Sequence, residues 1–173
     1  MKVFIFAGVN GAGKTTLYYN EIEKGKDFGR RINIDEIVSS FGDWKNQSDQ
    51  IRASKIAINL RNSYIQNAYD FNLETTLCGS SIIALFKKLQ ENGYSIYLYY
   101  VKVKSVDIAK NRVKQRVKKG GHNISEKLIE KRFKQSSKNL ETIIPFCKQV
   151  LIFDNSESEF QLVERESPKK SKI

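Results

Sequence analysis

The sequence feature that most constrains this chain is the glycine-rich run AGVNGAGKTT at residues 7–16. Residues 8–15 of this run match the pattern G-x-x-x-x-G-K-[ST] in full. The run follows the β-rich segment KVFIFA and precedes LYYNEIEK, which has the character of a helix. A strand that passes through a glycine turn directly into a helix is typical of an α/β domain.

This pattern suits the binding of nucleotide phosphates. Glycines allow backbone N–H groups to turn inward around phosphate oxygens, where a Cβ atom would obstruct them, and the helix that follows directs its positive end at the same anion. We expect Lys14 to reach the β- and γ-phosphates and Thr15 to coordinate Mg²⁺. The expected nucleotide-binding residues are Gly8, Asn10, Gly11, Ala12, Gly13, Lys14, Thr15 and Thr16. The run therefore predicts ATP and Mg²⁺ as cofactors rather than a purely structural glycine turn.

The rest of the chain alternates between strand and helix patterns. Strands are expected at residues 2–7, 31–34, 71–74, 95–103 and 149–154, and helices at 14–24, 47–69, 80–92, 105–119 and 125–144. Ser105 and Ser125 are suitable N-caps, and the helix at 47–69 has Ile51, Ile58 and Ile65 seven residues apart on one face. This alternation predicts a central parallel sheet with helices on both faces. We expect one domain over residues 1–160 and a polar, basic C-terminal tail over 161–173.

The composition excludes several classes of protein. The apolar runs of this 173-residue chain are too short to cross a bilayer, and its first residues lack the features of a signal peptide. We therefore expect a cytoplasmic protein without a membrane partner. Two cysteines and a single histidine form neither a disulfide framework nor a zinc site.

The positive charge is concentrated in one segment. The chain has a net charge of +11, and residues 102–138 contain thirteen basic and three acidic residues, so this segment alone contributes +10. Such a concentration favours a polyanionic ligand, whether a nucleotide, a nucleotide-sugar or a nucleic acid. The alternative is a lysine-rich helix face that is merely solvated.

Two acidic residues follow predicted strands and are candidates for the acceptor side of a kinase. Asp35 follows RINI and Glu74 follows FNL, and the carboxyl ends of parallel strands border the ligand crevice of an open α/β sheet. Asp35 would orient a hydroxyl group and accept its proton, although it could also be the N-cap of the helix that begins with IDEIV. The strong strand SIYLYYVKV ends in Lys102 and Lys104 instead of an acid, which disfavours a nucleotide hydrolase with a mechanical output.

Five blocks of the sequence together resemble the zeta toxin family of P-loop kinases, especially its short bacterial members. These blocks are the glycine-rich run, INIDEIV, LETTLCGSS, NGYSIYLYYV and RVKQRVKKGGHNISEKLIEKRF, and the resemblance covers about residues 2–155. It implies a three-layer P-loop kinase-like fold with a basic helical lid at about residues 105–138. It also implies ATP-dependent phosphorylation of a sugar hydroxyl of UDP-N-acetylglucosamine, and an antitoxin partner in some systems.

The resemblance further implies roles for individual residues. The catalytic base falls on Asp35, and the acceptor-binding Glu-x-Thr element falls on Glu74 and Thr76. The arginines that clamp the transferred phosphoryl group fall on Arg112 and Arg116, which are also i, i+4 neighbours on one helix face.

Other residues are weaker candidates. Arg132 would either reach the ligand or point into solvent, and His122 in GGHN would either contact a phosphate or serve as a turn residue. Asp154 and Asn155 follow the last predicted strand, where the adenine would be bound by analogy of fold. Two other functions stay open: a polynucleotide 5′-hydroxyl kinase and a nucleotide-dependent binding module without transfer chemistry.

Overall fold

The computed structural model describes residues 1–167, and residues 168–173 lie outside the described part. The strands are β1 (Lys2–Ala7), β2 (Arg30–Ile32), β3 (Phe71–Thr75), β4 (Ser95–Lys102), β5 (Gln149–Asp154) and β6 (Gln161–Glu166). The helices are α1 (Lys14–Glu23), α2 (Ile34–Phe41), α3 (Gln47–Gln66), α4 (Ser80–Glu91), α5 (Val106–Lys118) and α6 (Glu126–Ile143), followed by a short 3₁₀ helix (Ile144–Phe146). The predicted α/β fold is confirmed.

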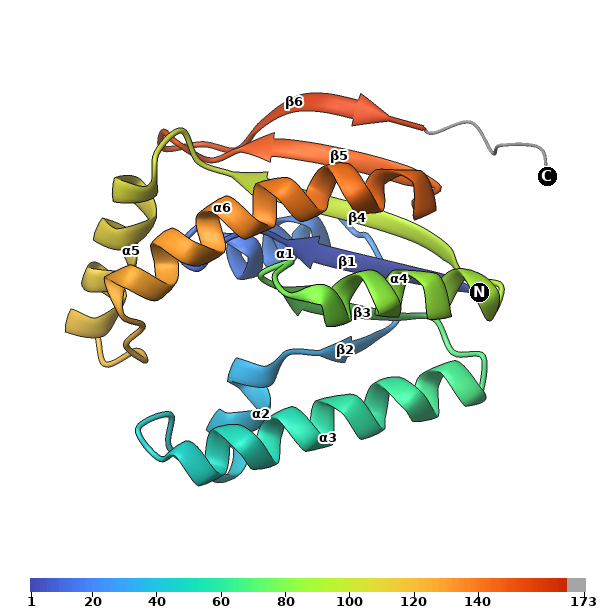
Figure 1. Ribbon diagram of the computed structural model, residues 1–173, viewed down its shortest axis with the longest axis horizontal. Helices are drawn as coiled ribbons and strands as arrows, with labels where there is room; N and C mark the ends of the chain where they lie inside the picture. The colour runs from blue at the N-terminus through green and yellow to red at the C-terminus, as the bar shows by residue number, and fades with distance from the viewer. Residues whose placement is uncertain (168–173) are drawn as a thin grey trace.

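The six strands form one sheet in the order β2-β3-β1-β4-β5-β6. The first five are parallel to one another, and β6 is antiparallel to β5 (Figure 1). The chain starts at the central strand β1. Strands β2 and β3 then lie on one side of β1, with β3 next to it, and β4 and β5 follow on the other side. The carboxyl ends of β1 and β3 therefore lie at the point where the winding direction changes, which is where open α/β sheets bind ligands.

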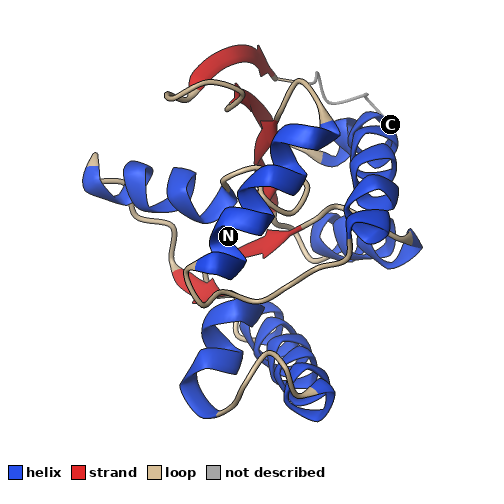
Figure 2. Cartoon of the chain, turned by 90° about the vertical axis from the view of Figure 1, so that its left-hand side faces the viewer, coloured by secondary structure: helices blue, strands red, loops and turns tan. Residues whose placement is uncertain are grey.

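Side chains of the parallel strands alternate between two hydrophobic clusters, one on each face of the sheet. In β1, Val3 and Ile5 join a cluster with residues of α3, α4 and α6, whereas Phe6 joins a cluster with residues of α1 and α5. Strand β4 repeats the pattern, with Leu98 on the first face and Tyr99 on the second. Figure 2 shows the helices on both sides of the twisted sheet. The layered arrangement follows from strands that are apolar on both faces.

Two expectations about the fold need correction. Residues 161–166 are not part of a tail, because they form β6 along β5, and only residues 168–173 of the expected tail lie outside the described part. In α3, Ile65 is buried but Ile51 and Ile58 are about half exposed. Residues seven apart differ by only about 20° around an α-helix, so the exposure of Ile51 and Ile58 depends on what faces each turn of α3 and not on their spacing. Ala53 and Ala57 fill the buried positions instead.

The predicted caps of the lid helices are present. Ser105 accepts a hydrogen bond from the backbone N–H of Ile108 at the start of α5, and Ser125 accepts one from Leu128 at the start of α6. These caps fix where each helix begins, and the cap by Ser125 sets the end of the segment that joins α5 to α6. Within residues 1–167, no helix combines the length and apolarity needed to cross a membrane.

Candidate active site

The glycine-rich loop is enclosed by close neighbours on two sides. Gly11 has φ +81°, and a Cβ atom there would lie 2.4 Å from the carbonyl oxygen of Ala109 in α5. Gly13 has φ +102°, and a Cβ atom there would lie 2.4 Å from the side-chain nitrogen of Asn155. Only glycine fits both positions, because a side chain would meet both backbone strain and a steric clash. The loop is thus fixed against α5 and the residue that follows β5.

Lys14 and Thr15 begin α1 directly after this loop. The ammonium group of Lys14 donates a hydrogen bond of 3.3 Å to the carbonyl of Val9. Burial lowers the pKa of Lys14, Glu74 and Asp35 act in the opposite direction, and Arg116 and Arg132 lower it further. The hydroxyl of Thr15 donates a hydrogen bond of 2.9 Å to Oε2 of Glu74.

Glu74 lies near the end of β3, beside β1, and its side chain is only 9% exposed. Its Oε1 atom accepts hydrogen bonds from Arg31 at 2.5 Å and from Asn33 at 3.1 Å. Arg31 also pairs with Glu36 at 2.8 Å. A carboxylate held by three donors is fixed in orientation, and one of those donors is the Thr15 hydroxyl. The two adjacent oxygen groups of Thr15 and Glu74 fit the preference of Mg²⁺ for hard oxygen ligands.

Asp35 lies in the first turn of α2, and its side chain is about half exposed. The N-cap of this helix is Asn33, whose side-chain oxygen accepts a hydrogen bond of 2.9 Å from the backbone N–H of Asp35. The alternative role of Asp35 as the N-cap is therefore wrong. With the cap supplied by Asn33, the carboxylate of Asp35 is left free to border the cleft.

Three arginines reach the same region from α5 and α6. Arg112 donates hydrogen bonds to the carbonyls of Asn155 at 2.6 Å and Glu157 at 3.2 Å. Arg116 donates to the ring and the carbonyl of His122, each at 3.1 Å. Arg132 of α6 donates to the side-chain oxygen of Asn10 in the glycine-rich loop at 2.8 Å, so it is directed toward the loop and not into solvent.

These residues border one cleft of about 750 Å³, a size usual for small-molecule sites. The cleft is lined by Asn10, Gly11, Gly13, Lys14, Thr15, Thr16, Asn33, Ile34, Asp35, Trp44, Gln50, Ser54, Glu74, Thr75, Thr76, Arg112, Arg116, His122, Asn123, Ile124, Ser125, Leu128 and Arg132. Every residue expected to catalyse the reaction or bind the acceptor is in this lining. Two glycine-loop candidates, Gly8 and Ala12, are not.

The two residues suggested for adenine binding lie elsewhere. Asp154 accepts hydrogen bonds from Ser156, and Asn155 donates a hydrogen bond of 2.7 Å to the carbonyl of Ala12. Neither of them lines the cleft. Asn155 instead supports the glycine-rich loop from behind, and its contact with Gly13 explains why that position is a glycine.

Sequence reasoning missed several residues of the site. Trp44, Gln50 and Ser54 line the cleft from the α2–α3 connection and the start of α3, and Arg31 orients Glu74 from β2. None of them belongs to a motif. The available signal for Trp44 was that it is the single tryptophan of the chain and lies in a short polar connection.

A family model for the zeta toxin matches residues 2–165 of the chain. The chain belongs to the zeta toxin family. An uncharacterized protein of Haemophilus influenzae is 33% identical to this family member over 137 residues, which span 76% of this chain and 92% of that protein.

Two solved structures show the same fold as this zeta toxin family member. The structure of the PezAT chromosomal toxin–antitoxin system of Streptococcus pneumoniae has a TM-score of 0.67 and 15% identity, with 95% of this chain and 71% of that chain covered. The structure of the Pnkp1/Rnl/Hen1 RNA repair complex has a TM-score of 0.64 and 21% identity over 82% of this chain. The match spans only 45% of the RNA repair chain, so it compares one domain of a larger protein.

Proposed function

We propose that this protein is an ATP-dependent kinase that transfers the γ-phosphoryl group to a sugar hydroxyl of a nucleotide-sugar such as UDP-N-acetylglucosamine. The observation that supports this proposal most strongly is that Lys14 and Asp35 border the same cleft. A phosphate-binding lysine and a carboxylate on opposite elements of one cleft suit the transfer of a phosphoryl group between two bound molecules. Membership of the zeta toxin family agrees with this reaction.

In the proposed reaction, Asp35 accepts the proton of the acceptor hydroxyl as its oxygen forms a bond to the γ-phosphorus. The bond from that phosphorus to the β–γ bridging oxygen breaks, and ADP leaves with the bonding electrons. Lys14 and Arg116 supply positive charge where negative charge develops. The guanidinium group of Arg116 lines the cleft, close enough to contribute this charge.

We assign the Mg²⁺ that accompanies ATP to Thr15 and Glu74, which supply adjacent oxygen atoms. When bound, Mg²⁺ neutralises charge on the β- and γ-phosphates. This assignment gives Glu74 a role on the phosphate side of the cleft in addition to its predicted role with Thr76 at the acceptor. The predicted acceptor role agrees with the position of Thr76 in the lining.

The test is mass spectrometry of the purified protein incubated with ATP, Mg²⁺ and a panel of UDP-sugars, with Asp35→Asn as the matched variant. We expect one phosphate to be added to a UDP-sugar by the wild type and a loss of several orders of magnitude in the variant. Equal phosphorylation by the Asp35→Asn protein would overturn Asp35 as the base, whereas ATP binding without consumption of ATP by either protein would support a nucleotide-dependent binding module. Consumption of ATP without modification of any sugar would reject the nucleotide-sugar as the acceptor.

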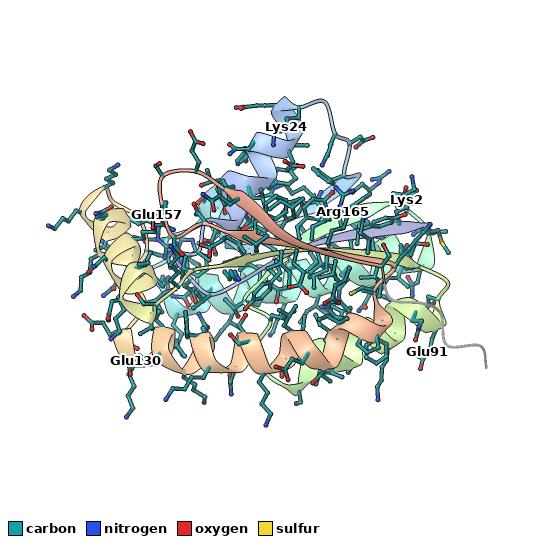
Figure 3. All side chains as sticks on the ribbon, turned by 90° about the horizontal axis from the view of Figure 1, so that it is seen from above. Lys2, Lys24, Glu91, Glu130, Glu157 and Arg165 are labelled. Atoms are coloured by element: carbon teal, nitrogen blue, oxygen red, sulfur yellow. The ribbon has the colours of Figure 1, made fainter. Side chains whose placement is uncertain are left out.

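A polynucleotide 5′-hydroxyl kinase is the second candidate, favoured by one feature of α6. Lys127, Lys131, Lys134 and Lys138 are exposed, lie on one face of the helix, and have no carboxylate partner within residues 1–167. By contrast, Lys110 and Lys114 of α5 pair with acidic residues of α6. Figure 3 shows Glu130, a partner of Lys110, where the two helices meet.

Salt dependence separates the two candidates, because a long polyanion releases many counterions on binding and a nucleotide-sugar releases few. Binding of a 5′-hydroxyl oligonucleotide that weakens steeply with salt, together with its phosphorylation, would favour the second candidate.

We also propose that this protein has an antitoxin as a protein partner, since the structurally similar PezAT is a toxin–antitoxin system. Arrest of bacterial growth on expression of the wild type, but not of Asp35→Asn, would support a toxin that needs an antitoxin.

A further inference from the structure

The single histidine of the chain lies in the connection between α5 and α6 and contacts three separate elements. Its imidazole stacks on the indole of Trp44, with ring centroids 4.3 Å apart and an angle of 20° between the planes. Its Nε2 atom lies 3.1 Å from Nη2 of Arg116. Its Nδ1 atom lies 3.7 Å from Oδ2 of Asp35. The side chain of His122 is only 12% exposed, so these contacts surround most of the ring.

The contact with Arg116 determines which ring nitrogen of His122 carries the proton. A guanidinium group only donates hydrogen bonds, so Nε2 must accept, and an accepting nitrogen carries no hydrogen. The proton of the neutral ring is then on Nδ1, the atom that faces Asp35. Arg116 therefore directs an N–H group of His122 toward the carboxylate.

The charges around the ring keep it neutral. Burial lowers the pKa of His122, and Arg116 of α5, Arg132 of α6 and Lys14 of α1 lower it further, while Asp35 of α2 acts in the opposite direction. At neutral pH the ring is thus an N–H donor without charge, which suits an orienting group better than a second cation.

The contacts also connect the lid to the element that carries Asp35. Trp44 lies in the connection between α2 and α3, and Asp35 lies in the first turn of α2. Arg116 holds His122 from α5 through both the ring and the backbone carbonyl. His122 therefore links α5 to the segment that carries Asp35 and Trp44.

We propose that His122 is a positioning residue, whose Nδ1–H holds Oδ2 of Asp35 and leaves Oδ1 to receive the proton of the acceptor hydroxyl. The present separation of 3.7 Å exceeds the usual 2.7–3.2 Å for such a bond, so an approach of less than about 1 Å on substrate binding would form it. This inference rests on the proposed role of Asp35 as the base. It adds that the base is oriented by a residue of the α5–α6 connection.

Nuclear magnetic resonance tests the geometry without any turnover, because the chain has one histidine and its ring signals need no assignment. In ¹⁵N-labelled protein near neutral pH, we expect Nδ1 to be protonated and Nε2 to be unprotonated. Asp35→Asn should lower the pKa of His122 further, since it removes the carboxylate that favours the charged ring. A proton on Nε2, or a titration that Asp35→Asn leaves unchanged, would overturn the proposal even if the protein is not a kinase.

Kinetics of matched variants test the consequence for the reaction. His122→Phe keeps an aromatic ring against Trp44 and removes the N–H group, so we expect kcat to fall about ten- to a hundredfold with the KM for ATP nearly unchanged. His122→Gln, whose amide can donate to Asp35, should recover part of the loss. Trp44→Phe, which keeps a stacking ring, should lose less than His122→Phe. Circular dichroism establishes that each variant is folded.

If the His122→Phe protein has the same kcat as the wild type, only the packing of the ring matters, and the proposal is overturned. The outcomes for Asp35→Asn keep the two claims separate. An active Asp35→Asn protein overturns the proposed base, whereas an inactive Asp35→Asn protein beside a fully active His122→Phe protein overturns only the role of His122.

Discussion

The hydroxyl of Thr15 donates a hydrogen bond of 2.9 Å to Oε2 of Glu74, although the two residues are separated by 59 positions in the chain. This bond joins the first turn of α1 to the end of β3 and places a carboxylate beside the phosphate-binding loop. Arg31 and Asn33 hold the other oxygen of the same carboxylate. Glu74 is therefore fixed from both sides, and its surroundings lead to the first prediction.

Glu74→Gln should weaken the response of the protein to Mg²⁺. The substitution keeps the shape of the side chain but removes the charge that Arg31 and the proposed metal require. We expect kcat to fall about ten- to a hundredfold and the dependence on Mg²⁺ to shift to higher concentration, measured by titrating the metal at fixed ATP. Glu36→Gln is the matched control, because Glu36 is the more exposed partner of Arg31 at 42%. Equal losses in both variants would contradict a specific role for Glu74.

Gly11→Ala should destabilise the fold far more than Gly25→Ala. Both glycines have a positive φ, of +81° and +84°, so both substitutions incur backbone strain of about 1–2 kcal/mol. At Gly11 the new Cβ would also lie 2.4 Å from the carbonyl of Ala109, whereas nothing lies within 4 Å at Gly25. We expect a loss of about 3 kcal/mol or more at Gly11, measured by chemical denaturation. Similar losses of unfolding free energy at the two positions would contradict the prediction, because α5 would then move to accommodate the added methyl group at low cost.

His122 should make the stability of the folded protein fall on mild acidification. Burial lowers the pKa of this histidine in the folded state below its ordinary value of 6.5, so the unfolded chain binds a proton first as the pH falls. Its contribution is fully present above about pH 6.5 and is lost as the pH falls toward and through the lowered folded pKa. We therefore expect the wild type to lose more free energy of unfolding between about pH 7 and pH 5 than His122→Gln does. Equal pH dependence in the two proteins would contradict a neutral, buried ring.

The two cysteines should differ in reactivity toward thiol reagents. Burial raises the pKa of the Cys147 thiol to about 12, so almost none of it is the reactive thiolate at neutral pH. Cys78 is only partly buried, and its sulfur lies 3.2 Å from the carbonyl of Thr76 in the cleft lining. We expect one thiol per native chain to be labelled quickly, and none in Cys78→Ser. Rapid labelling of Cys78→Ser without denaturant would contradict this prediction, because the reagent would then reach Cys147 within the hydrophobic core of the native protein.

Much of the fold was predictable from local patterns. Strands β1, β4 and β5 are short and mostly apolar, the glycine-rich run marks the passage from β1 to α1, and Ser105 and Ser125 mark where α5 and α6 begin. Strand β6 was missed because QLVERE is polar and exposed, and such a segment becomes a strand only through pairing with β5. The exposure of Ile51 and Ile58 was also unpredictable from spacing, since it depends on which side of α3 meets the rest of the molecule.

The sequence by itself determined the phosphate-binding loop, because consecutive residues with the required backbone freedom suffice for it. It also selected Asp35, Glu74 and Arg116, each at the end of an element or within a local motif. Only the tertiary structure decided that Thr15 meets Glu74, and that Trp44 and Arg116 enclose His122. These are contacts between residues far apart in the chain or on different elements. The order of the strands and the packing of α5 and α6 against the sheet create them, and no local pattern of residues encodes that geometry.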